Sequence, residues 1–379
     1  MSEFPAVRII DTTLRDGEQM PGVVFSPKQK IELAVKFSDF GIDRIEIMPA
    51  VSEAERKVAK ILCGMGLAQK LTASTMMRKD AVDMALDCGF EHITLFTPLS
   101  EIQLGTIGMT PEENIRKSME MADYALSHGL RVCFAGADTT RASPEYVSSF
   151  INSLARKIEY FMACDTLGCL TPMKAHSFFR EMCSKSRVPV CLHEHNDFGL
   201  ATANTISGIA AGAQMFSGTF TGIGERAGNA PIEEVLSSLK FLLGIELPVK
   251  YGRLAGICNA VEKYSGVRLQ SHKPIVGRNA FRHESGIHVD GFLKDARSYE
   301  FFDPALVGQQ SSISIGKHSG GSIIEYLTDC KIIGEKKQQV MSKIKDESQR
   351  RGRSLTKNEV FRIMQSFEQP YDETGVLYA

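Results

Sequence analysis

Short apolar or β-branched runs alternate with amphipathic segments through the first 220 residues of the chain, and this alternation limits the fold more than any other feature. Each run suits one strand, and each intervening segment suits one helix. Parallel strands need long crossover connections, so the alternation predicts a parallel sheet. The predicted strands are residues 7–10, 44–47, 71–75, 92–96, 131–134, 160–163, 188–192 and 215–219.

The segments between the predicted strands carry helix start signals. Pro27 follows Ser26 at the start of one amphipathic segment, and Pro111 follows Thr110 at the start of another. Serine and threonine are favoured N-caps, and proline is favoured in the first turn of a helix. These signals predict helices over residues 27–40 and 111–127.

Eight strand–helix units in about 220 residues match a closed (β/α)₈ TIM barrel, because an open doubly wound sheet usually stops at five or six strands. We therefore predict an α/β fold with a catalytic TIM barrel over residues 1–245, in which residues 232–243 form the eighth helix. Residues 246–379 are expected to form a small, mostly helical C-terminal region. It contains a Gly-, His- and Arg-rich stretch at 277–291 and a densely charged stretch at 335–353. The active site of a TIM barrel lies at the carboxyl ends of its strands.

Charge and cysteine content exclude several classes of function. The chain has 44 Lys and Arg against 45 Asp and Glu, a formal net charge of −1, so we expect no nucleic-acid partner. Its nine cysteines are scattered singly without CxxC spacing, which is typical of reduced thiols in the cytoplasm. Neither a signal peptide nor an apolar stretch of about 18 residues is present, so we expect no secretion and no membrane span.

The strongest local signal is the segment Leu-His-Glu-His-Asn-Asp at residues 192–197, where the seventh predicted strand ends. Residues two apart in a strand face the same way, so His193 and His195 are expected to point together into the barrel mouth. Two imidazoles at the catalytic face favour a divalent metal site. The alternative is one packed core histidine and one loop donor.

A second charged segment follows the first predicted strand: Asp-Thr-Thr-Leu-Arg-Asp-Gly-Glu-Gln, at residues 11–19. A carboxylate from this segment can complete a metal shell with the two histidines. The guanidinium of Arg15 can hold a substrate carboxylate or polarise a carbonyl oxygen. The alternative is an Arg–Asp ion pair that stabilises the loop.

A glycine-rich segment at residues 221–229, Thr-Gly-Ile-Gly-Glu-Arg-Ala-Gly-Asn, follows the eighth predicted strand. Its spacing is GxGxxxG rather than GxGxxG, and it comes last in the alternation, so it does not favour a dinucleotide cofactor. Loops after the late strands of a barrel often hold phosphate groups. A phosphorylated handle such as coenzyme A is therefore an open alternative.

Other polar residues fall at the same rim. Glu46 ends the second predicted strand, Asp138 follows the fifth, and Asp165 and Thr166 follow the sixth. Carboxylates at a barrel rim are more often hydrogen-bond partners of loops than catalysts. The cysteines at positions 133, 164 and 191 are interpreted as core residues.

Four separated motifs, in this order, resemble the 2-isopropylmalate synthase, homocitrate synthase and citramalate synthase family of metal-dependent acyl-CoA condensing barrels. They are DTTLRDGEQ, LHEHND, GIGERAGN and NAFRHESGIHVDG. The resemblance spans residues 7 to about 318. It implies that Asp16, His193 and His195 bind a divalent metal (Mg, Mn, Zn or Co), with the side-chain oxygen of Asn229 as a distant fourth ligand.

The same resemblance implies roles for five more residues. Arg15 would polarise the carbonyl of a 2-oxo acid, Thr166 would bind its carboxylate, and Glu46 would support the metal shell or Arg15. His288 and Tyr299, from the second region, would act on acetyl-CoA. In this family they usually reach the active site of the neighbouring subunit, so the resemblance implies a homodimer whose substrates are acetyl-CoA and a 2-oxo acid.

The chain departs from the family pattern in its fifth strand. The family sequence is roughly F-S-x-E-D-A-x-R, with a glutamate that acts with the histidine and tyrosine, and Ala137 stands at that position here. Homocitrate synthases have an arginine just before this phenylalanine, where this chain has Cys133, which disfavours a dicarboxylic 2-oxo acid. The chain also stops near the point where related synthases begin an allosteric domain, so no C-terminal allosteric domain is expected.

We expect a Claisen-type condensation that gives a 2-alkylmalate-type hydroxy diacid and CoA, as in amino-acid biosynthesis. The alternative is a metal-dependent lyase or aldolase that cleaves a hydroxy acyl-CoA or a hydroxy-oxo acid, as the similar hydroxymethylglutaryl-CoA lyases do. The second region with His288 and Tyr299 favours condensation. A catalytically silent barrel, suggested only by Ala137, conflicts with the intact metal residues.

Overall fold

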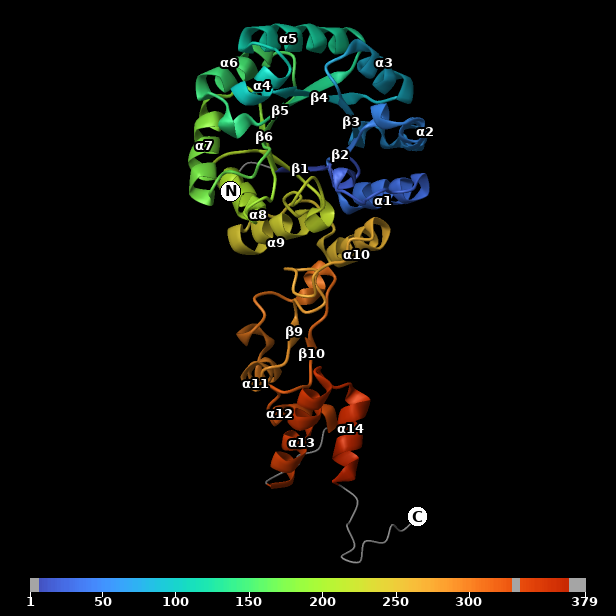
Figure 1. Cartoon of the computed structure of the whole chain (residues 1–379), viewed down its shortest axis with the longest axis vertical. Coiled ribbons are helices and arrows are strands. Elements are labelled where there is room, and N and C mark those ends of the chain that lie inside the picture. The colour runs from blue at the N-terminus through green and yellow to red at the C-terminus, as the bar shows by residue number, and fades with distance from the viewer. Residues whose placement is uncertain (1–6, 329–334, 368–379) are drawn as a thin grey trace, which may run out of the picture. The chain divides into compact units, whose positions relative to one another are not determined.

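Eight parallel strands close into a barrel in the computed structural model, which describes residues 7–328 and 335–367 (Figure 1). Each strand pairs with the next along the chain, and the eighth returns to the first, with Met215 opposite Arg8 and Gly218 opposite Asp11. The predicted TIM barrel is therefore confirmed. The strands are β1 (Arg8–Asp11), β2 (Arg44–Ile47), β3 (Leu71–Thr75), β4 (His92–Pro98), β5 (Arg131–Ala137), β6 (Phe161–Asp165), β7 (Val190–Glu194) and β8 (Met215–Gly218).

Helices follow the strands along the chain and lie around the barrel (Figure 1). They are α1 (Pro27–Phe40), α2 (Glu53–Leu62), α3 (Lys79–Cys88), α4 (Glu101–Thr106), α5 (Pro111–Ser127), α6 (Pro144–Leu154), α7 (Pro172–Lys185), α8 (Ala201–Ala210), α9 (Ile232–Leu243) and α10 (Leu254–Ser265). The helices predicted at 27–40, 111–127 and 232–243 are found at those bounds. The Ser26 and Thr110 side chains cap α1 and α5 and form capping boxes with Gln29 and Glu113.

Strands β4 to β7 each end two or three residues later than the sequence predicts. In β4 and β5 the pairing continues through Thr97 opposite Gly136 and Pro98 opposite Ala137. Proline is tolerated at a strand end because its carbonyl can still accept a hydrogen bond. Pro98, which marks a loop in the sequence, thus belongs to a strand of the barrel.

The interior of the barrel below the rim is packed with apolar and thiol side chains. This cluster contains Ile10, Cys133, Ala135, Tyr160, Met162, Cys164, Cys191 and Met215, with Phe96 against it. The contributing residues alternate along β5 and along the segment that ends in β6, as expected for inward-facing positions. The three strand cysteines are core residues, as interpreted from the sequence, and every cysteine that the structure describes is a free thiol.

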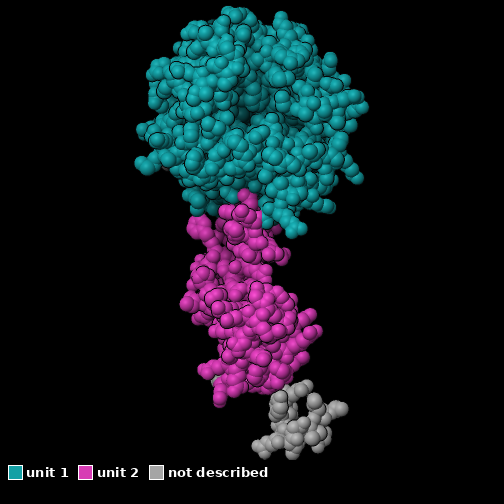
Figure 2. All heavy atoms as spheres, viewed as in Figure 1, with its two compact units in different colours: residues 1–269 teal, residues 270–379 magenta. Residues whose placement is uncertain are grey.

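The first compact unit of the structure is longer than the barrel domain predicted from the sequence. The units comprise residues 1–269 and 270–379 (Figure 2), whereas the sequence placed the boundary at residue 245. The difference is due to α10, which contacts α1 and whose buried residues include Leu254, Ile257 and Val261. The chain leading to α10 is also anchored, because the Lys250 backbone N–H donates to the Phe40 carbonyl at 2.9 Å.

The second unit is mostly helical, as predicted. Its elements are β9 (Arg282–His283), α11 (Gly286–Lys294), β10 (Ser312–Ile313), α12 (Ser322–Thr328), α13 (Glu335–Arg351) and α14 (Lys357–Ser366). The two short strands pair in parallel. A separate core holds the last three helices together, and it contains Ile315, Ile323, Ile324, Val340, Met341, Ile344, Leu355, Val360 and Met364.

No helix among the described residues is both long enough and apolar enough to cross a lipid bilayer.

Candidate active site

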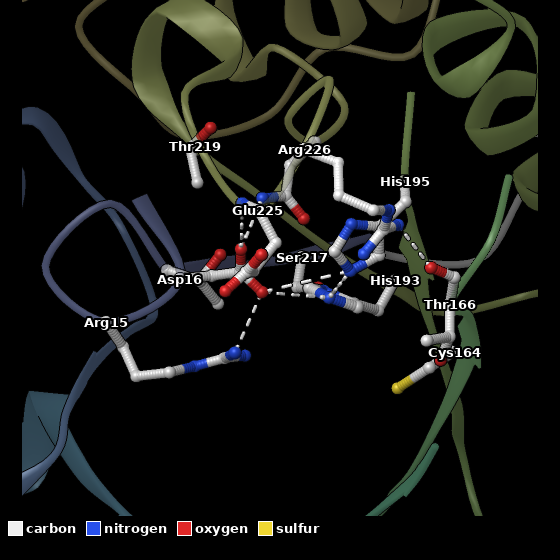
Figure 3. Close-up of polar contacts among 12 residues, drawn as sticks. Arg15, Asp16, Cys164, Thr166, His193, His195, Ser217, Thr219, Glu225 and Arg226 are labelled. Atoms are coloured by element: carbon white, nitrogen blue, oxygen red, sulfur yellow. Dashed lines mark hydrogen bonds and ion pairs between the residues drawn. The ribbon is translucent and has the colours of Figure 1, made fainter. Parts of the chain in front are cut away.

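Three potential metal ligands converge at the carboxyl ends of the strands. Asp16 lies in the loop after β1, His193 lies on β7, and His195 directly follows that strand (Figure 3). The two Nε2 atoms are 3.1 Å apart, and Asp16 Oδ2 is 3.4 Å from the first and 3.9 Å from the second. All three ligand atoms lie within 4.8 Å of one another, and all three side chains are buried. The structure thus brings together the three residues singled out in the sequence.

The imidazole of His193 is oriented by a residue that the sequence analysis missed. Its Nδ1 lies 2.7 Å from the hydroxyl of Ser217 on β8. A donor proton on Nδ1 leaves the lone pair of Nε2 free, which is how ligating histidines are usually fixed. Ser217 comes two residues after Met215, which lies in the barrel core. Because residues two apart in a strand face the same way, the sequence could have predicted that Ser217 also points into the barrel.

The imidazole of His195 is suited to bind a metal in its neutral form. Burial, and then the nearby His193, lower its pKa to about 3. Its ring is buried and meets the ring of His193 edge to face. An imidazole that stays unprotonated near neutral pH keeps a lone pair available for a divalent ion.

Asp16 is held in place by hydrogen bonds from the loop after β8. Its Oδ1 accepts from Asn229 Nδ2 at 2.9 Å and from the Glu225 backbone N–H at 3.2 Å. Burial alone would raise the pKa of Asp16, but Arg15 and the two imidazoles hold it well below its usual value. The carboxylate is therefore ionised, as a metal ligand must be.

The glycine-rich segment after β8 allows the loop to lie close to Asn229 and Asp16. A Cβ at Gly224 would lie 2.1 Å from Asn229 Nδ2 and 2.8 Å from Asp16 Oδ1, so only glycine fits there. The side-chain oxygen of Asn229 is buried and has no hydrogen-bond partner among the described residues. A buried orphan oxygen beside three converging ligands fits a divalent ion, since an unsatisfied buried acceptor is otherwise costly.

Arg15 connects this cluster to a second carboxylate. Its Nη1 lies 2.8 Å from Asp16 Oδ2, and its Nε lies 2.8 Å from Oε2 of Glu46 on β2. The two carboxylates outweigh burial and raise the pKa of Arg15. The ring of Phe96 lies 5.0 Å from the guanidinium carbon. The Nη2 atom is buried and has no partner among the described residues, which leaves one strong donor available to a substrate oxygen.

Glu46 supports Arg15 rather than the histidines. Oε2 of this carboxylate accepts from Arg15 and also from the Ser74 hydroxyl of β3 at 3.2 Å. The sequence left open whether Glu46 acts on the metal shell or on Arg15, and the contacts favour Arg15. Ser74 was not singled out in the sequence, although it lies on the inner face of its strand.

Thr166 follows β6 on the other side of the mouth. Its hydroxyl oxygen accepts the backbone N–H of Asp138 at 2.8 Å, so its own proton is free to be donated. The carbonyl of Thr166 accepts from Arg226, whose guanidinium also forms a two-point ion pair with Asp197 at 2.7 and 2.8 Å. This arrangement joins the loops after β6, β7 and β8 and was not predicted.

The end of β5 carries no ionisable group into the mouth. Ala137 is the last residue of the strand and lies opposite Pro98. Asp138 follows the strand with a φ of 57°, and its buried carboxylate is bound by Arg141 at 2.8 and 2.6 Å. The negative charge of Asp138 is therefore balanced by Arg141 of the same loop.

His288 and Tyr299 belong to the second unit. Their rings stack with centroids 4.1 Å apart and an interplanar angle of 26°. His288 lies on α11, and both residues are exposed to solvent. The neighbouring His283 is bound to Glu300 through Nε2 at 3.1 Å. The structure thus brings His288 and Tyr299 together as a pair.

Two protein-family models match the chain, one over the barrel and one over the second unit. The family model described as HMGL-like matches residues 6–261, which is more than half of the chain. The chain belongs to the HMGL-like family. A second model, described as homocitrate synthase post-HMGL domain-like, matches residues 275–368 of this HMGL-like protein.

Curated relatives of this HMGL-like protein are named as three kinds of synthase. A homocitrate synthase of Methanothermobacter thermautotrophicus is 36% identical, over 98% of this chain and 96% of its own length. An (R)-citramalate synthase of Methanocaldococcus jannaschii is 38% identical, over 85% of this chain and 66% of its own. A 2-isopropylmalate synthase of the same organism is 38% identical, over 84% and 62%. The resemblance inferred from the four motifs is confirmed.

Solved structures share the barrel fold. The HMG-CoA lyase of Bacillus subtilis superposes with a TM-score of 0.62 at 22% identity, over 74% of this chain and 98% of that one. The hydroxymethylglutaryl-CoA lyase of Pseudomonas aeruginosa gives a TM-score of 0.62 at 21% identity, over 70% and 95%. At this identity the likeness concerns the fold alone.

Proposed function

We propose that this protein is an acyltransferase that condenses acetyl-CoA with a 2-oxo acid. The observation that carries the proposal is the position of Arg15, which contacts Asp16 and keeps one buried donor free beside the three converging ligands. Such a site suits a reaction in which negative charge develops on a ketone oxygen. The names of the curated synthases support the same chemistry.

Asp16, His193 and His195 would hold a divalent metal ion, with Asn229 Oδ1 directed to the same shell. One carboxylate and two neutral imidazoles suit Mg²⁺, Mn²⁺, Zn²⁺ or Co²⁺. When bound, the ion supplies Lewis acidity for the ketone oxygen of the substrate. A hydrogen bond from His193 Nδ1 to the Ser217 hydroxyl would keep the ring in the tautomer that this role needs.

Arg15 would stabilise the oxygen that becomes negatively charged. Its free Nη2 can donate to the ketone oxygen, and Glu46 with Ser74 keeps the guanidinium from turning away. The Thr166 hydroxyl can donate to the substrate carboxylate, because its oxygen already accepts from the Asp138 backbone. These donors are fixed before the reaction, which is what makes electrostatic stabilisation effective.

His288, stacked on Tyr299, would remove a proton from the acetyl methyl group. The enolate carbon then bonds to C2 of the 2-oxo acid, and its ketone oxygen gains the electron pair and a proton. Water next cleaves the thioester, which releases CoA as a thiol and leaves a carboxylate. The product is a 2-alkylmalate-type hydroxy diacid.

We propose that the active protein is a homodimer in which His288 and Tyr299 act on the barrel of the neighbouring copy. Both side chains are exposed, and their surroundings on the second unit include the exposed apolar residues Ile287 and Phe301. Exposed apolar groups beside a catalytic pair suit a surface that is covered by a partner. We also assign the reaction to the cytoplasm and to amino-acid biosynthesis, consistent with the free thiols and with the curated names.

The experiment that tests this function uses purified protein with Mg²⁺ or Mn²⁺, acetyl-CoA and a panel of 2-oxo acids. We expect release of free thiol and formation of a hydroxy diacid by mass spectrometry. Incubation with 3-hydroxy-3-methylglutaryl-CoA or 4-hydroxy-2-oxo acids tests the lyase alternative. The lyases share the barrel fold with this chain. Cleavage of one of these compounds without any condensation would replace the proposal by that alternative.

A further inference from the structure

Tyr299 lies at the end of an exposed segment of the second unit. Residues 293–299 are all exposed, whereas Glu300, the next residue, is buried with 8% of its surface exposed. Exposed segments with few buried contacts open easily, so a side chain on such a segment keeps a fixed position only if the segment is attached nearby. Glu300 is the first residue after Tyr299 at which the chain enters the interior of the second unit.

The carboxylate of Glu300 is bound through both of its oxygens. Oε1 lies 3.1 Å from Nε2 of His283 on β9, and Oε2 accepts from the hydroxyl of Ser311 at 2.9 Å. Ser311 directly precedes β10, which pairs with β9 in parallel. Hydrogen bonds to a charged group are stronger than those between neutral groups. The residue after Tyr299 is therefore firmly connected to both short strands.

The imidazole that binds Glu300 also borders the ring of Tyr299. The ring of His283 stacks on Phe292 with centroids 4.9 Å apart, and it lies 6.4 Å from the ring of Tyr299. Tyr299 in turn stacks on His288 at 4.1 Å. Ring pairs at these separations attract one another. Glu300 thus supports the tyrosine ring through the adjacent backbone and through the neighbouring imidazole.

Gly291 provides the space that the Tyr299 ring occupies. It lies three residues after His288 on α11, so both positions are on the same face of the helix. A Cβ at position 291 would lie only 2.6 Å from Tyr299 Cε2, so the ring lies directly against the helix backbone. Its contact with His288 therefore depends on where Glu300 holds the backbone of the tyrosine.

We propose that Glu300 is a positioning residue of the reaction, which holds Tyr299 against His288 by binding His283 and Ser311. This inference rests on the proposed role of His288 and Tyr299 in the condensation. Ala137 brings no carboxylate to the end of β5, which gives more weight to support from within the second unit.

Two substitutions at Glu300 test this role in turnover. The amide of Glu300→Gln can still accept from His283 and donate to Ser311, whereas Glu300→Ala loses both contacts. We expect Glu300→Ala to lower kcat for thiol release about 100-fold, because a displacement of about 1 Å can cost this much. The KM for the 2-oxo acid should not change, because that acid binds in the barrel. Glu300→Gln should restore kcat to within about threefold of wild type.

Glu359→Ala is the matched control for damage to the second unit. Glu359 is also a glutamate of this unit, but it forms the capping box of α14 and binds Arg353. Its removal should destabilise the unit and leave kcat unchanged. If circular dichroism shows that Glu300→Ala does not fold, Ser311→Ala takes its place. This variant removes one of the two contacts and should lower kcat about three- to tenfold.

Nuclear magnetic resonance of protein labelled at its histidines tests the position of the pair without turnover. The stacked Tyr299 ring shifts the signals of the His288 ring protons, and His288→Ala identifies these signals. Gly291→Ala gives their unstacked position, because the added methyl group displaces Tyr299 while alanine favours the helix. We expect Glu300→Ala to move the signals to that position, and Glu300→Gln to leave them at the wild-type position.

The outcomes separate this inference from the proposed function. Unchanged His288 signals in Glu300→Ala, or a wild-type kcat in that variant, would overturn the role of Glu300. A Glu300→Gln protein with the kcat of Glu300→Ala would overturn it as well. A wild-type protein that condenses no 2-oxo acid, but loses the stacked signals in Glu300→Ala, would contradict the proposed function and support the positioning of the pair.

Discussion

Arg15 and Asp16 are adjacent in the sequence and form an ion pair in the structure, with Nη1 2.8 Å from Oδ2. The pair joins the residue proposed to polarise the substrate to the carboxylate proposed to hold the metal. Glu46 contacts Arg15 from the other side at 2.8 Å through Nε. One planar guanidinium thus contacts two carboxylates and still presents a third nitrogen.

Replacing Arg15 by lysine should remove most of the activity and leave the metal in place. A single ammonium group cannot contact both carboxylates and also present a donor to substrate. We expect kcat to fall at least about 100-fold, measured by thiol release, with unchanged metal content. Arg78→Lys, at an exposed ion pair on another loop, is the matched control and should retain the wild-type rate. A fully active Arg15→Lys protein would remove this arginine from the mechanism.

Asp11 should make the fold less stable as the pH rises. Burial raises its pKa to about 8, although hydrogen bonds from Thr13 act in the opposite direction. Between the ordinary aspartate pKa, about 4, and this value, the unfolded chain loses the proton while the folded chain keeps it. The free energy of unfolding therefore falls through this window, by up to about 1.4 kcal/mol per pH unit from this group.

Asp11→Asn removes that contribution. The free energy of unfolding of this variant, relative to that of the wild type, should therefore rise steadily between pH 5 and pH 7.5. Chemical denaturation at each pH measures the difference, and the exposed Asp87→Asn serves as the comparison. A stability difference between wild type and Asp11→Asn that is constant over this range would show that Asp11 is ionised in the folded protein.

Ala137→Glu should change either the rate or the substrate range. In the proposed mechanism His288 acts without a carboxylate partner, and such a partner would fix the tautomer of the ring and support proton removal. Asp138 cannot take this place, because Arg141 binds both of its oxygens. We expect Ala137→Glu to raise the condensation rate or to exclude a larger substrate that occupies the space beside residue 137. If both properties stay unchanged, the alignment of β5 with the family is wrong, and Glu46 is the first alternative carboxylate to test.

Mixing two inactive variants tests the dimer. An Arg15→Ala protein and a His288→Ala protein carry their defects in different units, so a mixed dimer contains one intact site if the units act across the interface. We expect activity to return on mixing, up to about a quarter of wild type for random exchange between otherwise silent variants. Arg15→Ala mixed with Glu46→Ala is the control and should stay inactive. A fully active monomer on sizing chromatography would exclude the arrangement.

The sequence allowed the barrel and the cluster of Asp16, His193 and His195 to be predicted because both depend on local patterns. Strand and helix periodicity identified all eight units, and alternation along β7 placed His193 and His195 on one face. The loop with Arg15 and Asp16 followed from its position after β1. Each of these predictions needs only residues that are close in the chain.

Features that depend on distant residues could not be predicted. The Ser217 contact to His193 and the Arg226 contact to Thr166 join different strands, and neither residue type is distinctive in its own segment. The unit boundary at residue 269 was not predicted, because the strand–helix alternation ends after the helix at 232–243. The apolar stripe of α10 gives no indication of which surface it covers.

The most direct test of the metal-dependent site is to strip the protein with EDTA and to titrate it with Mn²⁺, following binding by calorimetry and thiol release in parallel. We expect about one ion per chain, loss of turnover in the stripped protein and recovery of turnover with the same midpoint as binding. His195→Ala should abolish both signals while His283→Ala, at a histidine outside the cluster, keeps the binding signal. Full turnover by the stripped protein, or wild-type Mn²⁺ binding by His195→Ala, would contradict the site at Asp16, His193 and His195.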